Sequence, residues 1–215
     1  MRKYSEKFLN NYKILKQAIV GIEIEFFSNH SFYKTIELLN LELAPVNVHG
    51  FNVYHSTFTP DDKNFKIEID LSGGSEMREI VTGPLDYQSA RYYLIKLLNF
   101  VSKNGYTTDK SSIHINISFG KDSPKQLIDL NILKHILKTD EEDVYRVFPN
   151  RKNNIYAKSI KKMIPFKDYD FSNVNIASIA NVMKLPDDRY FGVNYLHMDE
   201  YESCRLEYRY IGGEG

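Results

Sequence analysis

Apolar and polar residues alternate without interruption along several short segments of the chain. Between residues 18 and 27, Glu23 and Glu25 share one face of a strand, and the apolar residues between and around them share the other. A solvated strand face would explain one such segment. The same alternation returns, however, in residues 65–71, 112–119 and 205–211. The four segments together predict a sheet with one buried face and one polar face.

A fifth strand is predicted at residues 77–82, after a Gly-rich turn at residues 72–75. Its direction is antiparallel to the strand at 65–71. Glu79 falls on the face of the apolar Met77 and Val81 in this strand. Two explanations stay open: a β-bulge re-aims the side chain, or the carboxylate lies beside apolar neighbours.

Apolar residues at steps of three and four predict the helices. These helices cover residues 3–17, 31–41, 86–103 and 124–138, with a shorter one at 176–183. Separated by turns and helices, the alternating strands form a mainly antiparallel sheet whose apolar face the helices cover. The predicted fold class is therefore α+β, in a single domain over residues 1–215.

Composition narrows the choice of partner and compartment. The 28 basic and 28 acidic residues give no net charge, which argues against nucleic acid as a partner. One cysteine, Cys204, fits a reducing compartment, and no apolar run is long enough to span a membrane. We expect a cytoplasmic protein, or one of the host cytoplasm or virion if the source is viral. The sequence does not indicate the oligomeric state.

The polar face of the predicted sheet is rich in carboxylates, with one imidazole and two arginines. A lone histidine on a strand is as well explained by surface polarity as by metal binding. Oxygen-rich clusters with one histidine suit Mg²⁺ or Mn²⁺ rather than Zn²⁺, and arginines beside such metals are typical of phosphoryl transfer. No Gly-rich phosphate loop is present, so metals and arginines would have to bind the phosphates. The residues are Glu23, Glu25, Glu68, Asp70, His114, Asn116, Arg205, Glu207 and Arg209.

Five short motifs occur in order along almost the whole chain, from residue 20 to residue 211. They are Gly-Ile-Glu-Ile-Glu-Phe at 21–26, Asp70 with the segment 79–85, Ile-His-Ile-Asn at 113–116, the segment 150–158, and Arg-Leu-Glu-Tyr-Arg at 205–209. The set resembles the amidoligase family of the carboxylate-amine ligase superfamily, which shares the fold of glutamine synthetase and glutamate-cysteine ligase.

The resemblance implies a curved, mainly antiparallel sheet that holds ATP and two or three Mg²⁺ (or Mn²⁺) ions on its concave face. A substrate carboxylate would attack the γ-phosphate of ATP, and an amine would capture the acyl phosphate to form an amide. The substrates would be an amino acid, a peptide or a protein side chain, which the sequence does not identify. By similarity, the metal ligands would be Glu23, Glu25, Asp70, Glu79, His114 and Glu207. Arg205 and Arg209 would meet the phosphates as catalytic residues, and Arg151, Asn154 and Lys158 would bind nucleotide or substrate together with Arg209.

Two other functions remain open at this point. Family members continue into a further helical segment where this chain ends at Gly215, so we expect a shortened amidoligase-like domain. That expectation, with 16 Tyr and 13 Phe, favours a non-catalytic structural or assembly protein, for example a virion-associated one, that keeps the ligase fold. The positive charge at residues 151–162 would serve a nucleic-acid-binding protein, against which the balanced total charge argues.

Overall fold

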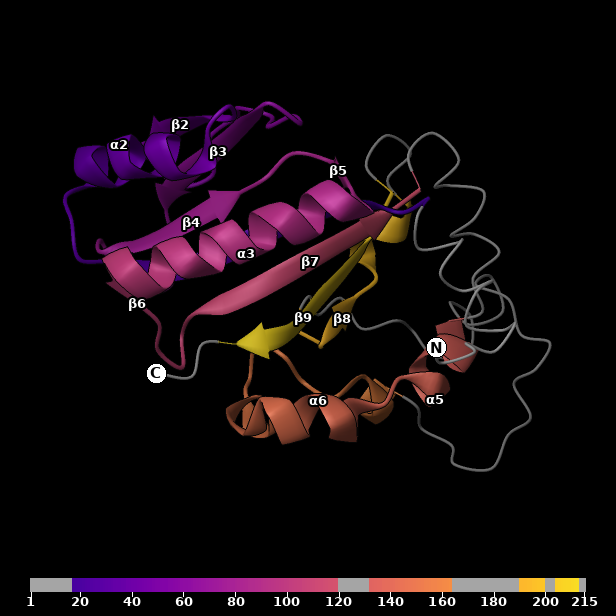
Figure 1. Ribbon diagram of the computed structural model, residues 1–215. Coiled ribbons are helices and arrows are strands. Elements are labelled where there is room, and N and C mark those ends of the chain that lie inside the picture. Colours follow the sequence, from indigo (N-terminus) through magenta and orange to yellow (C-terminus); the bar gives the residue numbers. More distant parts are fainter. Residues whose placement is uncertain (1–16, 120–131, 164–189, 200–203, 213–215) are drawn as a thin grey trace, which may run out of the picture.

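A computed structural model describes residues 17–119, 132–163, 190–199 and 204–212 (Figure 1). The helix predicted at 3–17, apart from residue 17, and the helix predicted at 176–183 lie outside the described residues. The first part of the helix predicted at 124–138 also lies outside them. The described part is an α+β fold built on one open sheet of nine strands. No described helix is both long and apolar enough to cross a bilayer.

The sheet runs in the order β2-β3-β4-β1-β7-β9-β8, with the short β5 and β6 also paired to β1. Strands β2 and β3 are parallel, and all other pairs among the described strands are antiparallel, so the sheet is mixed. The strands are β1 (Ile19–Ser28), β2 (Asn47–Phe51), β3 (Asn64–Ile69), β4 (Met77–Val81), β5 (Leu85–Asp86), β6 (Gly105–Tyr106), β7 (Ser112–Ser118), β8 (Val193–Asn194) and β9 (Leu206–Gly212).

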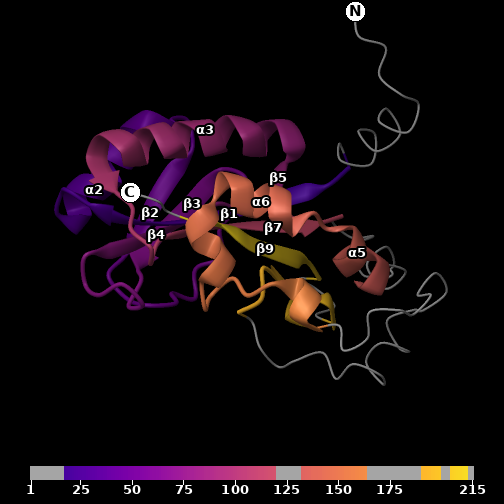
Figure 2. The ribbon, with the colours of Figure 1, turned by 90° about the horizontal axis from the view of Figure 1, so that it is seen from below.

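Strand β1 lies at the centre of the sheet, and its alternation divides the two faces as predicted. Ile22, Ile24 and Phe26 are buried against the helices α2 (Phe32–Leu43) and α3 (Tyr87–Asn104), which lie on the same side of the sheet (Figure 2). Phe26 meets Phe100 of α3 edge to face, with ring centroids 6.2 Å apart. Burying these side chains is the main favourable contribution to folding.

The two long helices begin where the sequence predicts. The Ser31 hydroxyl accepts a hydrogen bond from the backbone of Lys34, and Asp86 caps α3 in the same way. Helix α3 ends at Asn104, and the backbone of its C-cap residue, Gly105, is extended rather than left-handed. Glycine is required there because an added Cβ would collide with the carbonyl of Phe27.

A second apolar cluster covers the end of the sheet formed by β8 and β9. It includes Leu206 and Tyr210 of β9 and Ile136 of the short helix α5 (Ile132–Lys138). Figure 1 shows α5 and α6 (Glu141–Val147) on the side of β9 away from α3. The short 3-10 helices η2 (Pro149–Asn153), η3 (Ile160–Met163) and η4 (Leu196–Asp199) complete this end.

The buried carboxylate of Glu141 ties this part of the chain to β9. It accepts hydrogen bonds from the hydroxyls of Tyr210 (2.6 Å), Ser159 (2.6 Å) and Tyr145 (3.3 Å), and from the backbone N–H of Ile160 (2.9 Å). A buried carboxylate is stable only with such partners. The network therefore fixes residues 141–160 against the sheet.

The position of Glu79 resolves the alternatives left by the sequence. Glu79 pairs regularly with Glu25 of β1 and with Glu68 of β3, which excludes a bulge at this point, the first of the two alternatives. Ile80 enters the helix-covered core, which leaves Glu79 on the opposite face of β4. A register shift does occur elsewhere, between β7 and β9, where one extra residue of β9 lies between Tyr208 and Ile211.

Candidate functional site

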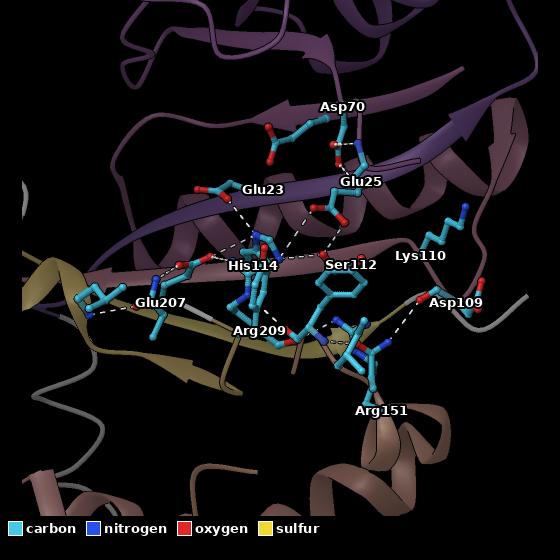
Figure 3. Close-up of a pocket in the computed structure, with 18 of the residues that line it drawn as sticks. Glu23, Glu25, Asp70, Asp109, Lys110, Ser112, His114, Arg151, Glu207 and Arg209 are labelled. Atoms are coloured by element: carbon cyan, nitrogen blue, oxygen red, sulfur yellow. Dashed lines mark hydrogen bonds and ion pairs between the residues drawn. The ribbon is translucent and has the colours of Figure 1, made fainter. Parts of the chain in front are cut away.

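A cleft of about 940 Å³ lies over the polar face of the sheet (Figure 3). Its floor comes from β1, β4, β7 and β9, and its walls come from residues 54–55, 150–156 and 190–197. Ten of the eleven residues predicted for the site line it: Glu23, Glu25, Asp70, Glu79, His114, Arg151, Asn154, Arg205, Glu207 and Arg209. The eleventh, Lys158, does not line the cleft, and its ammonium lies 5.8 Å from the ring centroid of Tyr190.

Strand register brings the acidic residues of separate motifs together. Glu23 is opposite His114 of β7, and Glu25 is opposite Glu79 of β4. The side chains of directly opposite residues in antiparallel strands lie about 5 Å apart at Cβ. Segments more than 50 residues apart in the sequence therefore contribute to one cluster.

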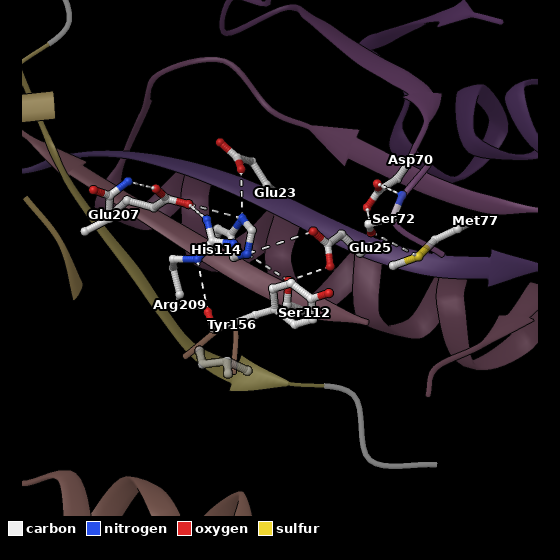
Figure 4. Close-up of polar contacts among 12 residues, drawn as sticks. Glu23, Glu25, Asp70, Ser72, Met77, Ser112, His114, Tyr156, Glu207 and Arg209 are labelled. Carbon is white, nitrogen blue, oxygen red and sulfur yellow. Dashed lines mark hydrogen bonds and ion pairs between the residues drawn. The ribbon is translucent and has the colours of Figure 1, made fainter. Parts of the chain in front are cut away.

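His114 is the centre of the polar contacts (Figure 4). Its Nδ1 lies 3.0 Å from Glu23 Oε2 and 3.3 Å from Glu207 Oε1. Its Nε2 lies 2.8 Å from the hydroxyl of Ser112 and 3.9 Å from Glu25 Oε1. The imidazole is 4% exposed, so it is fixed by these neighbours rather than by water.

The carboxylates of the cluster differ in their electrostatic surroundings. Burial alone would raise the pKa of Glu23, but the hydrogen bonds from His114 and Asn116 and the charges of His114 and Arg205 outweigh it and lower this pKa to about 2. Burial raises the pKa of Glu25, and the charge of His114 and a hydrogen bond from Ser112 offset only part of that effect.

Glu79 has the least favourable surroundings of the cluster. Burial, and then the negative charges of Glu23 and Glu25, raise its pKa well above the ordinary value. Within the described part of the chain, its carboxylate forms neither a hydrogen bond nor an ion pair. Asp70, by contrast, accepts hydrogen bonds from the backbone and the hydroxyl of Ser72, at 2.8 and 2.9 Å.

The donor set fits a hard divalent cation. One possible ligand atom from each of Glu23, Glu79 and His114 lies within 4.8 Å of the others. Two carboxylates and one imidazole suit Mg²⁺ or Mn²⁺, with the remaining coordination positions open to water or substrate. Such an ion would also contact the Glu79 carboxylate, which forms neither a hydrogen bond nor an ion pair with the described residues.

Glu207 and Arg209 form a pair at the edge of this cluster. Arg209 donates to Glu207 Oε1 at 2.5 Å, and Asn194 donates to Glu207 Oε2 at 2.7 Å. Arg205 donates to the side-chain oxygen of Asn116 at 3.2 Å. Both arginines thus lie on the side of the cleft formed by β9, next to the acidic cluster.

Arg151 lines the cleft but is buried, with 3% of its surface exposed. Its guanidinium donates to the backbone carbonyls of Arg209 (3.0 Å), Ile211 (3.2 Å) and Tyr210 (3.4 Å). These contacts hold η2 against β9. Asn154, also predicted to bind nucleotide or substrate, donates to the backbone carbonyl of Asp109 at 3.4 Å and accepts from the backbone of Tyr156.

Several residues that line the cleft were not among the predicted site residues, and three of them contact the acidic cluster. Ser112 contacts both Glu25 and His114, and the alternation of β7 already placed it on the polar face. Asn194 and His197 flank Glu207, the latter with its Nε2 3.9 Å from Glu207 Oε2. Glu68 lies on the open face as predicted, opposite Glu79, but it is buried against Lys66 and the backbone of Ser56 and does not line the cleft.

The fold and the site define an α+β protein with an acidic, arginine-flanked cleft on the open face of a mixed sheet. No protein-family model matches the sequence, and no curated protein matches it. The resemblance to amidoligases therefore rests on the five sequence motifs alone.

Proposed function

We propose that this protein is an ATP- and Mg²⁺-dependent carboxylate-amine ligase with a glutamine synthetase-like sheet. The observation that carries the proposal is the Glu79 carboxylate, which is enclosed by other acids and has no hydrogen-bond donor among the described residues. Like charges held together in this way cost stability unless a cation lies between them. A function that binds such a cation gives this cluster of acids a reason.

The chemistry follows from the two sides of the cleft. Mg²⁺ held by Glu23, Glu79 and His114, with Glu25 and Asp70 nearby, would supply the positive charge that neutralises the phosphate oxygens of ATP. On the β9 side, Arg209 and Arg205 would bind the phosphoryl group and stabilise the charge that develops on it. Glu207 orients Arg209 through their 2.5 Å contact.

The reaction would take place in two displacements. A carboxylate oxygen of the substrate attacks the γ-phosphorus, and the bond to the bridging oxygen breaks, which releases ADP and leaves an acyl phosphate. An amine then attacks the acyl carbon, loses a proton, and releases inorganic phosphate as the amide forms. The cleft of about 940 Å³ is at the upper end of ordinary ligand sites, so it has room for a nucleotide and a second substrate.

Thermal unfolding is the first test of this proposal. We expect millimolar Mg²⁺ with a non-hydrolysable ATP analogue to raise the Tm of the wild type, and Glu25→Gln to abolish most of that shift. Asp62→Asn, an exposed carboxylate before β3, makes the same change in charge and should leave the shift intact. No shift in the wild type would contradict the proposal.

A second test detects the acyl phosphate directly. Hydroxylamine captures acyl phosphates as hydroxamates, which form coloured iron(III) complexes. We would incubate the protein with ATP, Mg²⁺, hydroxylamine and single amino acids, and compare the wild type with Glu79→Gln. An ATP-dependent hydroxamate from one carboxylate, absent in the variant, would identify the acid substrate.

A non-catalytic assembly protein is the second candidate, because apolar side chains are exposed on the outer surface of the helices. Tyr33 and Leu41 of α2 are 79% and 72% exposed, and Tyr92 and Ile95 of α3 are about half exposed. Exposed aromatic residues are typical of interfaces. This candidate predicts no Tm shift with Mg²⁺ and nucleotide, so the first test separates the two.

A further inference from the structure

Ser112 links two members of the acidic cluster through one hydroxyl group. The residue begins β7 and is 6% exposed. Its Oγ lies 2.5 Å from Glu25 Oε2 and 2.8 Å from His114 Nε2 (Figure 4). The alternation of the strand explains this position, because residues 112 and 114 point to the same face.

The direction of both hydrogen bonds of Ser112 follows from which groups can donate a proton and which can only accept one. A hydroxyl has one proton to donate, and an ionised carboxylate can only accept. When Ser112 donates to Glu25, its oxygen must accept from His114, so Nε2 carries the proton. The relay then runs from His114 to Ser112 to Glu25.

The relay also selects the ligand atom of His114. A neutral imidazole with its proton on Nε2 has its lone pair on Nδ1. Nδ1 is the nitrogen that faces Glu23, at 3.0 Å, and Glu207, at 3.3 Å. A cation that binds in the acidic cluster would meet this lone pair, in place of the Nδ1–H that donates to Glu23 in the metal-free protein.

We propose that Ser112 is a positioning residue that holds His114 in the Nε2–H tautomer and orients Glu25 toward the same cation. The inference rests on the proposed function, since it concerns the residues that would bind Mg²⁺. Partners that orient a metal-ligating histidine change metal affinity by about 10–100-fold when they are removed. The role requires no contact between Ser112 and the ion.

The affinity test uses Mn²⁺ alone as the probe, titrated by calorimetry or by electron paramagnetic resonance. We expect Ser112→Ala to weaken Mn²⁺ binding about 10–100-fold. Ser112→Thr keeps the hydroxyl and should restore most of the affinity. The matched control is Ser111→Ala: this neighbour is fully buried, but its hydroxyl accepts from the backbone of Thr108 and does not reach the cluster.

A spectroscopic measurement separates positioning from simple structural support. In the Mg²⁺-loaded protein, ¹⁵N shifts of the imidazole report which nitrogen carries the proton, and comparison with His114→Gln assigns the signal among the six histidines. We expect the Nε2–H form in the wild type and its loss, or a mixture of tautomers, in Ser112→Ala. A variant that is merely less stable would keep the wild-type tautomer.

The possible outcomes distinguish this inference from the proposed function. If the wild type binds Mn²⁺ and Ser112→Ala binds it equally well with the same tautomer, the role of Ser112 is wrong and the metal site stands. If the wild type binds no divalent cation, both proposals fall. Should Ser112→Ala not fold, an Nδ1–H signal from His114 in the loaded wild type would overturn the inference, and an Nε2–H signal would support it.

Discussion

Replacement of Glu79 by Gln should change the stability of this protein in opposite directions with and without Mg²⁺. The change keeps the shape of the side chain and removes its charge. In the metal-free protein it removes repulsion from Glu25 and Glu68, the two cross-strand neighbours of Glu79. In the presence of Mg²⁺ it removes a ligand.

The magnitude can be worked out from the strand register. A like charge directly across a strand costs up to about 1 kcal/mol, so removing one charge with two such neighbours stabilises the metal-free protein by about 1–2 kcal/mol. For a chain of this size, that corresponds to a rise in Tm of about 2–8 °C. The sign agrees with the raised pKa of Glu79, because burial and nearby acids disfavour its ionised form.

The metal contribution is expected to be larger. At 10 mM Mg²⁺ and a Kd of about 0.1 mM, binding stabilises the wild type by about 2.7 kcal/mol, and the variant should lose most of this. The assay is a pair of thermal melts for each protein, in EDTA and in Mg²⁺, at pH 7.5. Glu79→Gln should melt above the wild type in EDTA and below it in Mg²⁺, while Asp62→Asn should follow the wild type in both.

Two results would refute this reasoning. If Glu79→Gln melts below the wild type in EDTA, the carboxylate makes a favourable contact in the metal-free protein, and the repulsion argument fails. If the variant keeps the full Mg²⁺ shift, Glu79 is not a ligand, and the cation binds elsewhere or not at all.

Three further predictions concern the part of the fold around β9. Arg151→Lys should lower the free energy of unfolding by about 2 kcal/mol in urea melts, because a compact ammonium lacks the planar fork that reaches three successive backbone carbonyls of β9. Unchanged stability with weaker nucleotide binding would instead support the predicted nucleotide contact. Glu141→Gln should cost about 2–3 kcal/mol by the same assay, since its amide places a donor among four donors, whereas Glu142→Gln on the exposed face should cost less than about 0.5 kcal/mol. Burial lowers the pKa of His135, which lies between the hydroxyls of Tyr195 and Tyr208, so as pH falls below about 6.5 the unfolded chain takes up this proton first and stability decreases. His135→Gln should remove up to about 1.4 kcal/mol per pH unit of that dependence between pH 6.5 and 5.5, and an unchanged slope would contradict the assignment.

The strands that carry the site could be predicted because their pattern has a strict period of two. A buried face requires Ile22 and Ile24 to point one way, which directs Glu23 and Glu25 the other way whatever the tertiary contacts are. The long helices were predicted for a similar reason, since their caps and apolar stripes are local. Ten residues that line the cleft were predicted from this alternation together with the resemblance of the motifs.

Other features depend on contacts that no local pattern reports. The guanidinium of Arg151 is drawn to carbonyls of β9, some 60 residues away in sequence, so the local concentration of positive charge gave no sign of its burial. The alternation of β4 did not reveal that the face shared by Glu79 and Met77 is the cleft face. That assignment depends on which side of the sheet α2 and α3 cover, which is a property of the whole fold.

The total charge of the chain is balanced, but acidic and basic side chains are separated within the cleft. This separation of charge is the main reason to regard the cleft as a functional site. Acidic side chains from β1 and β4 lie across His114 from Arg209 of β9, and Arg209 forms an ion pair with Glu207 of its own strand (Figure 4). Full pairing would satisfy the charges without any ligand. Because Arg209 is held by Glu207 and Glu79 is left beside other acids, the cluster stays short of positive charge at one point. A divalent cation is the most direct way to compensate the negative charge beside Glu79. The phosphates of a nucleotide bound to that cation would then lie near the arginines.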